Sequence, residues 1–481
     1  MWLWLLACVQ EKPTESLPLE EPIVVKPAVC PQDLPGATCG RVELPETEDS
    51  GRRITLSTAV FPATVATVGP PLVLFTGGPG ADVFDLAGLF GPSGPYASLN
   101  EDRDLVLFSE RGSFGATPFL GCPELADVDA VFQEPDDVRF AVELEAYGRC
   151  HDRLVGAGVN LAAFNNARRA ADVPLVLGAL GYTEWYLWGV SGGALLAQTV
   201  LRDHPQGVAG VMLDSGGFSH AHMAVVATDL LANAQDRFDR LYAECAADSA
   251  CSAAFPDLEA RLHSLVATLE ATPRRVSVTH PGTGVTAELA LDGDLLLQLY
   301  TGNMASVAYL PLVTALAEGG DFSLIEPSIP AARVADAAAN SAAGLYLSTF
   351  CADLGETLPS EVDRAGVDAD LDQALSGALE NLFSACERWD VPALAPGGPV
   401  ASTTIPLLVM EGLYDTNRRP DEGAVVAAQF STAYLAEYHD RGHVVLDDCA
   451  ASMMRQFMAD PTTAPLSRCV PQKVTWVTGG G

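Results

Sequence analysis

Positive charge is scarce in this chain, which has three lysines in 481 residues. Lysines and arginines together number 27, against 62 aspartates and glutamates, and the formal charge is −35. A protein this acidic repels the phosphate backbone of nucleic acids, which binding proteins neutralise with lysine and arginine. We therefore expect a well-solvated surface and no nucleic-acid partner.

Other signals are also missing. Beyond the first eight residues there is no run of 18 apolar residues, so we expect no membrane-spanning helix. The glycine-rich segments lack the GxxxxGK and GxGxxG patterns that cradle phosphates. The cysteines lack the close CxxC pairs of zinc sites, and His220 and His222 have no matching ligand cluster. Residues 368–379 lack the glycine and the glutamate of a calcium loop, so we predict neither a metal site nor a cofactor.

Cysteine, in contrast, is abundant, and its number, eleven, is odd. Many cysteines without metal-site spacing indicate an oxidising compartment. The segment ending at Cys8 resembles a bacterial lipobox, in which the cysteine is lipidated and becomes the new amino terminus. The basic region and long apolar core of a signal peptide are missing before Cys8, so either the start codon is assigned late or Cys8 sits in a short hydrophobic stub. We predict an exported protein, either periplasmic, extracellular or an outer-surface lipoprotein anchored to a membrane through Cys8.

The other ten cysteines are expected to form disulfides. Consecutive pairing is the simplest arrangement, because short loops close at the least entropic cost. The alternative is that some of them are free, buried thiols that behave as small hydrophobic residues. The ten are Cys30, Cys39, Cys122, Cys150, Cys245, Cys251, Cys351, Cys386, Cys449 and Cys469.

The hydrophobic pattern alternates strands and helices around a long helical insertion. Continuous apolar runs are typical of buried parallel strands, and their alternation with helices implies a sheet covered on both faces. The strand runs are 71–75, 105–108, 185–188, 208–213, 405–410 and 434–438. We therefore predict a signal or lipobox-like segment (1–8), a flexible tether (9–29), an α/β core in two parts (30–216 and 401–475) and a mostly helical cap (217–400).

A G-x-S-x-G motif at residues 189–193 provides a candidate nucleophile, Ser191. The motif lies between an apolar strand run and a helical stretch that begins at residue 193, which is the setting of a nucleophile elbow. So tight a turn requires small flanking residues, here Gly189 and Gly193. It also presents the serine oxygen at the helix start, where free N–H groups favour an oxyanion.

A serine hydroxyl needs a base, and the base in turn needs an acid to orient it. In the fold that an elbow implies, the acid and then the histidine follow the serine in the chain, each after a late strand. Asp415 and His443 fit these two positions. Glu411 and Asp440 are alternatives for the acid, and His439, which would lie inside the last strand, is the alternative base.

A glycine-rich loop, Thr76-Gly77-Gly78-Pro79-Gly80, follows the strand run 71–75. One interpretation of this segment is an ordinary glycine-rich turn. With an elbow in the same chain, this loop is also where the second N–H of an oxyanion hole should come from. We predict that Gly78 and Gly192 are the two donors.

These motifs together resemble the α/β-hydrolase serine peptidases of the proline iminopeptidase and tripeptidyl aminopeptidase type. The similarity rests on Gly-Gly-Pro-Gly, Glu110-Arg111-Gly112, the elbow, Asp415 and Gly442-His443, in that order. The secreted tripeptidyl-aminopeptidase branch is most similar, through segments such as Leu-Asp-Ser at 213–215 and Cys-Glu-Arg-Trp at 386–389. This chain departs from the family pattern at Thr76, Ser109 and Gly192.

The resemblance implies an α/β-hydrolase fold with a helical cap, and hydrolysis of small peptides from their free amino terminus through a Ser-His-Asp acyl-enzyme mechanism. Carboxylates in the cap would have to bind the substrate ammonium, and Asp353 and Glu387 are the candidates. A carboxylesterase or lipase with the same triad is one alternative, because fold and triad do not choose between amides and esters. A surface lipoprotein that binds ligands without turnover is the other.

Overall fold

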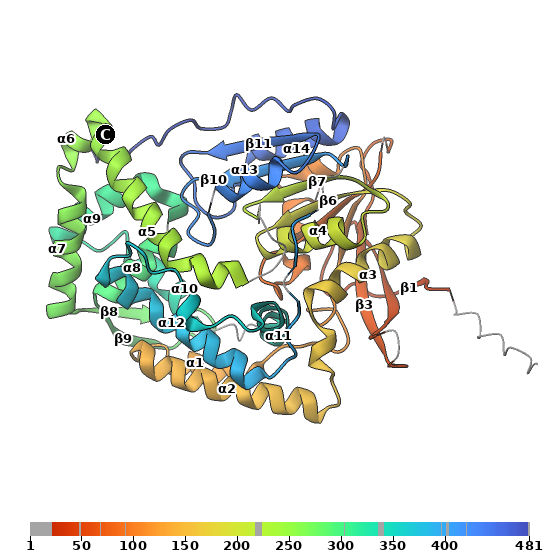
Figure 1. Cartoon of the computed structure of the whole chain (residues 1–481), viewed down its shortest axis with the longest axis horizontal. Helices are drawn as coiled ribbons and strands as arrows, with labels where there is room; N and C mark the ends of the chain where they lie inside the picture. The colour runs from red at the N-terminus through yellow and green to blue at the C-terminus, as the bar shows by residue number, and fades with distance from the viewer. Residues whose placement is uncertain are drawn as a thin grey trace, which may run out of the picture.

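The structure is a computed structural model that describes residues 22–47, 50–67, 69–91, 93–216, 224–302, 304–334, 341–395, 397–400, 404–419 and 421–479. The lipobox-like segment with Cys8, most of the predicted tether, and His220 and His222 lie outside these residues. Figure 1 shows a strand-rich part next to a largely helical part. We call the first the core and the second the cap.

The core is built on a nine-stranded sheet of order β1-β2-β3-β5-β4-β6-β7-β10-β11. All pairs from β5 to β11 are parallel, whereas β1, β2 and β3 form an antiparallel edge that joins β5. The central parallel strands are apolar runs, as a sheet buried on both faces requires. The strands are β1 (Val25–Pro27), β2 (Thr38–Pro45), β3 (Arg53–Phe61), β4 (Leu72–Phe75), β5 (Leu105–Phe108), β6 (Trp185–Val190), β7 (Val208–Asp214), β10 (Leu407–Gly412) and β11 (Ala433–Tyr438).

Helices cover both faces of this sheet. Alternate residues of a strand serve opposite faces, so Val73 belongs to one hydrophobic cluster and Leu74 to the other. Helices α3 (Asn166–Ala179) and α4 (Gly192–Asp203) contribute to the first cluster, and α13 (Asp421–Ala427) adds Val426 to it. The second cluster contains η1 (Val83–Leu89), η2 (Ala97–Asn100) and α14 (Asp448–Ala459).

The cap is formed by the chain between β7 and β10, and it has a hydrophobic cluster of its own. The sequence predicts a mostly helical cap, and the structure adds a two-stranded hairpin in which Val276, Val278, Leu289 and Leu291 point inward. The elements are α5 (Ala224–Ala247), α6 (Ser249–Ala254), α7 (Leu258–Ala271), β8 (Arg274–Thr279), β9 (Thr286–Leu291), α8 (Gly293–Gly302), η5 (Met304–Tyr309), α9 (Leu310–Glu318), η6 (Glu326–Ser328), α10 (Ile329–Arg333), α11 (Ala343–Leu354), η7 (Pro359–Glu361) and α12 (Ala369–Trp389).

Helix α2 (Asp136–Gly156) joins the two parts. Its carboxyl-terminal half packs into the core through Cys150 and Leu154. Its first residue, Asp136, pairs with Arg333 of the cap and accepts a hydrogen bond from Gln298 at 2.9 Å. The short elements around it are η3 (Pro123–Leu125), α1 (Ala126–Asp129) and η4 (Leu161–Ala163). No helix in the described ranges is both long and apolar enough to cross a membrane.

Five disulfides join the ten cysteines in consecutive order, which is the pairing that the short intervals favour. After Cys469 the chain crosses from the core to the cap, as Figure 1 shows, and we call residues 470–479 the C-terminal strap. Val474 and Trp476 pack against the cap cluster, and the N–H of Val477 donates to the carbonyl of Ala308 at 3.0 Å. The strap therefore links the end of the core to the cap.

Candidate active site

Ser191 occupies a strained turn between β6 and α4. Its backbone has φ 54° and ψ −122°, a conformation that non-glycine residues avoid and that costs about 1–3 kcal/mol. A Cβ atom at Gly189 would lie 2.4 Å from the carbonyl oxygen of Gly193, and one at Gly193 would lie 2.3 Å from that of Phe75. The flanking glycines are therefore required by close backbone contacts, as the elbow motif predicts.

Ser191, His443 and Asp415 form one hydrogen-bonded chain. The Nε2 atom of His443 lies 2.8 Å from Oγ of Ser191, and its Nδ1 atom lies 2.8 Å from Oδ2 of Asp415. The loops that carry Asp415 and His443 also bond to each other, because the N–H of Tyr414 donates to the carbonyl of Arg441 at 2.9 Å. The structure thus brings together the three residues that the sequence selects from positions far apart in the chain.

Asp415 lies in a fully buried polar setting. The N–H of Asn417 donates to its Oδ1 at 2.8 Å, and Nε of Arg418 lies 3.6 Å from its Oδ2. Burial lowers the pKa of Arg418 to about 10, which leaves the guanidinium charged at neutral pH. Besides His443, Asp415 therefore has a backbone hydrogen-bond donor and a cation beside it.

The residues predicted as alternatives for the acid and the base have other partners. Glu411 is buried and pairs with Arg418. Asp440 lies within 3.7 Å of Nε of Arg441, and His439 lies just beyond the end of β11, where its N–H donates to the carbonyl of Pro471. The geometry therefore selects Asp415 and His443 as the partners of Ser191.

The glycine-rich loop lies directly against the elbow. A Cβ atom at Gly77 would come within 3.1 Å of the Cβ of Ser191, and one at Gly192 within 2.4 Å of the Gly78 carbonyl oxygen. Gly78 has φ 104°, which favours glycine. The N–H of Gly192 opens α4, where no preceding turn can accept it. The structure therefore leaves no room for a side chain at position 192 unless the glycine-rich loop shifts.

The other departures from the family pattern have structural partners. The Thr76 hydroxyl donates to the carbonyl of Ala81 at 3.3 Å and so closes the glycine-rich loop. Ser109 is buried, and its Oγ accepts the N–H of Ser57 at 2.8 Å. In the same segment, Arg111 forms a buried bidentate pair with Asp172 of α3, at 2.6 and 2.8 Å. The Thr76 bond therefore holds the glycine-rich loop, which lies directly against the elbow.

The structure places the two predicted ammonium-binding carboxylates on the cap helices α11 and α12. Asp353 lies within electrostatic range of Arg202, in the last turn of α4, whereas Ser191 precedes the first turn. Glu387 is exposed and shares a surface pocket with His151 and other residues of α2. Their role in binding a substrate ammonium stays a prediction.

Three supporting residues were not singled out from the sequence. Asp214 contacts the loop of His443, Asn233 of the cap contacts the loop of Asp415, and Arg418 lies next to Asp415. Asp214 lies at the end of β7, the strand next to the elbow strand β6. A carboxylate at this position of a predicted strand could have been recognised from the sequence as a candidate site residue. The role of Asn233 depends on the docking of the cap and has no local sequence signal.

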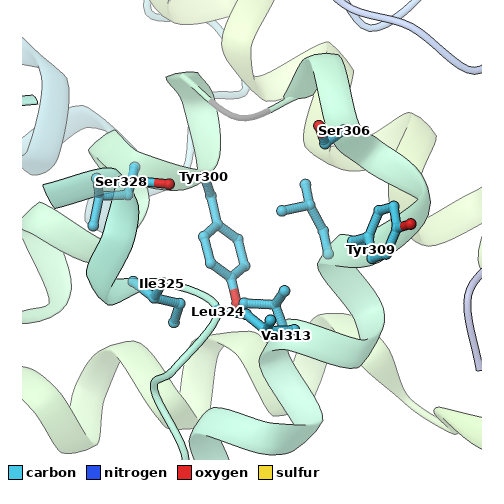
Figure 2. A pocket seen from close by; sticks show the side chains of 9 residues that line it. Tyr300, Ser306, Tyr309, Val313, Leu324, Ile325 and Ser328 are labelled. Carbon is cyan, nitrogen blue, oxygen red and sulfur yellow. The ribbon is translucent and has the colours of Figure 1, made fainter. Parts of the chain in front are cut away.

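A separate pocket of about 220 Å³ lies inside the cap. Figure 2 shows the ring of Tyr300 in its middle, with Tyr309 and Ser306 on one side and Ile325 and Ser328 on the other. None of its nine lining residues belongs to the Ser191, His443 and Asp415 chain.

Potential metal ligands gather at one place in the described part of the chain, where Cys122, Glu124 and Cys150 meet. Both sulfur atoms of this group are joined in a disulfide, so neither can be a thiolate ligand.

Comparison with known proteins agrees with this fold. The family model described as alpha/beta hydrolase fold matches residues 70–285, which contain the glycine-rich loop and the elbow. No curated protein matches the chain. The sheet order, the elbow and the matched family segment together establish the α/β-hydrolase fold.

Solved structures similar to this chain include several kinds of hydrolase. A proline iminopeptidase from Mycobacterium smegmatis is 15% identical, with a TM-score of 0.38 over 87% of this chain and 95% of that one. A thermophilic esterase from Thermogutta terrifontis is 14% identical, with a TM-score of 0.37 over 88% of this chain and 99% of that one. A putative epoxide hydrolase from Pseudomonas aeruginosa is 16% identical, with a TM-score of 0.35 over 89% and 96%.

Proposed function

We propose that this protein is a serine hydrolase in which Ser191 is the nucleophile, His443 the base and Asp415 the acid. The observation that carries the proposal is the pair of 2.8 Å contacts of His443, one to Ser191 and one to Asp415. A histidine held between a serine hydroxyl and a buried carboxylate is the arrangement that activates a serine.

The geometry supports acyl transfer in two stages, formation of an acyl-enzyme and its hydrolysis. His443 takes the proton of Ser191 as Oγ attacks the scissile carbonyl, and the N–H groups of Gly78 and Gly192 stabilise the oxyanion. His443 then gives the proton to the leaving group. Water repeats the sequence on the acyl-enzyme and releases the acid. Throughout, Asp415 orients the imidazole and stabilises its charged form.

We further propose that the substrates are small peptides, which the enzyme cleaves from the free amino terminus. The support is the ordered set of motifs, from Gly-Gly-Pro-Gly to Gly442-His443, that resembles the iminopeptidase and tripeptidyl-aminopeptidase type. The cap lies between β7 and β10, the strands whose ends carry the loops of the site. A cap there would exclude folded proteins and admit short peptides.

Labelling with a fluorophosphonate probe tests the catalytic serine. We expect covalent modification of the wild-type protein, loss of modification in Ser191→Ala, and unchanged modification in Ser452→Ala, which removes an exposed serine on α14. Absence of Ser191-dependent modification would show that Ser191 is not an active nucleophile, and would overturn the proposal.

Matched substrates test the reaction class. We expect tripeptidyl anilides with a free amine to be hydrolysed, and the same anilides with an acetylated amine to react at least about tenfold more slowly. Short acyl esters of nitrophenol are the comparison. Turnover of the esters alone, dependent on Ser191, would identify a carboxylesterase and overturn the peptidase proposal while leaving the serine mechanism in place.

We also propose that the protein is exported and anchored through a lipid on Cys8. The five disulfides are compatible with an oxidising compartment outside the cytoplasm. The lipobox-like sequence before Cys8 supports the anchor.

A further inference from the structure

Asp214, the last residue of β7, is hydrogen-bonded to both sides of the site. Its backbone carbonyl accepts the N–H of Ser191 at 2.9 Å and so fixes the elbow. Its side-chain Oδ1 accepts the N–H of Val445, two residues after His443, also at 2.9 Å. The carboxyl group is fully buried and also interacts with the Ser215 side chain. Burying a carboxyl group is costly, so we expect Asp214 to have a role beyond packing.

Ser215 adds a second hydrogen bond to the loop of His443. Its Oγ accepts the N–H of Val444 at 2.8 Å. The φ angles of Ser191, Ser215 and Val444 are 54°, 52° and 67°, so three strained backbones meet here. Val444 is β-branched, for which a positive φ is especially unfavourable. Such strain persists where contacts enforce it, and the bonds from residues 214 and 215 hold the backbone directly after His443.

The carboxyl group of Asp214 also faces the charges of the site. An ionised Asp214 stabilises an imidazolium at His443, because opposite charges attract strongly where water is excluded. Burial raises the pKa of Asp214 to about 6, so the group is charged at neutral pH and gains a proton as the pH falls through that value. The titratable groups that face it are His443, Asp415, Arg418, Tyr96 and Tyr438.

We propose that Asp214 and Ser215 are positioning residues for His443, and that the Asp214 carboxylate is a second negative charge, besides Asp415, that stabilises the imidazolium formed during catalysis. This inference rests on the proposed function, in which His443 is the base. Both residues act through His443 and have no part in bond making. Ser215 contributes position alone, whereas Asp214 contributes position and charge, and this difference separates the two effects in an experiment.

Three variants make the test. Ser215→Ala removes the acceptor for Val444 and leaves every charge in place. Asp214→Asn keeps an oxygen that can accept the N–H of Val445 and removes the charge. If this asparagine variant does not fold, Asp214→Ser is used in its place. The matched control is Ser109→Ala, because Ser109 is also buried in the core and its Oγ also accepts a backbone N–H at 2.8 Å. Thermal unfolding of each variant shows that it is folded.

The measurement is the second-order rate of modification by the fluorophosphonate, followed from pH 5 to 9. We expect Ser109→Ala to react within about twofold of the wild type, and Ser215→Ala to react about 10- to 100-fold more slowly with an unchanged midpoint of the acid limb. We expect the neutral Asp214 variant to move that midpoint to lower pH by about one unit, because the imidazolium has lost a stabilising charge.

The outcomes distinguish this inference from the proposed function. If the wild type shows no Ser191-dependent modification, the proposed function fails. If the wild type reacts and Ser215→Ala matches Ser109→Ala, the positioning role is overturned. If the neutral Asp214 variant keeps the wild-type midpoint, the electrostatic role is overturned.

Discussion

Asn233 of the cap donates a hydrogen bond from Nδ2 to the backbone carbonyl of Asp415, 3.1 Å away, and both residues are buried. One turn further along α5, Nη1 of Arg237 donates to the carbonyl of Leu413 at 3.0 Å. Between these two points, Tyr414 belongs to the hydrophobic cluster of the cap. The loop that carries the proposed acid is therefore held by the cap as well as by the sheet, and the cap does more than cover the site.

The first prediction concerns this hydrogen bond. Asn233→Ala should lower kcat/KM about tenfold with a small change in KM, because the freed carbonyl lets the loop of Asp415 shift. The control is Asn381→Ala, which removes a different asparagine hydrogen bond of the cap, to Glu143 of α2. Steady-state kinetics of both variants make the comparison, and equal losses in the two would show that the cap does not position the acid.

The second prediction concerns the buried pair of Glu411 and Arg418. Arg418→Leu should lower the free energy of unfolding by about 3–5 kcal/mol, because it removes the cation that pairs with the buried Glu411. Glu411→Leu combined with Arg418→Leu should recover most of this loss. Denaturant unfolding measures both, and an exposed-pair variant, Arg455→Leu, should change stability by less than about 1 kcal/mol. A double variant as unstable as Arg418→Leu would contradict the argument.

The third prediction is the pH dependence of stability at Asp214. Its folded-state pKa of about 6 lies above the value of 3.8 for an unperturbed aspartate, so the folded state holds the proton more tightly than the unfolded state. Its ionisation therefore lowers stability as the pH rises from about 4 to about 6, by roughly 2–3 kcal/mol. Asp214→Asn should lack this component. We would measure the unfolding midpoints of the wild type and of Asp214→Asn across that range. The two midpoints should be similar near pH 4, and the wild-type midpoint should fall below that of the variant as the pH rises to 6.

The fourth prediction concerns the C-terminal strap. Replacing Cys449 and Cys469 by serine opens the disulfide at the base of the strap and should lower the free energy of unfolding by about 3 kcal/mol. Hydrogen exchange at the amide of Val477, which bonds to Ala308, should become faster. Replacement of Cys30 and Cys39 is the control, because that disulfide closes a loop at the other end of the sheet. Unchanged protection of Val477 would show that the disulfide does not hold the strap.

The fifth prediction concerns the amino terminus. Intact mass spectrometry of the non-reduced mature protein, made in a bacterial host that lipidates exported proteins, should show five disulfides and a lipid-modified Cys8. Cys8→Ser should lack the lipid mass and leave the membrane fraction. A free Cys8 thiol in the mature wild-type protein would contradict the anchor.

Much of the site could be predicted because it depends on local rules. The elbow needs glycines on both sides of a serine between a strand and a helix, and the acid and base follow late strands in a fixed order. The parallel strands were visible as continuous apolar runs, since both of their faces are buried. The antiparallel strand β2 was not visible in this way, because its alternating polar residues resemble a surface segment.

The sequence by itself determined the α/β-hydrolase fold, the central strands, the pairing order of the cysteines, and the choice of Ser191, Asp415 and His443. The tertiary structure alone decided that Asp214, Ser215 and Asn233 support the loops of the site. The reason is physical. Strands, turns and helices can be predicted from residues that are neighbours in the sequence. Contacts between the cap, the end of β7 and the loops of Asp415 and His443 depend instead on how distant segments pack together.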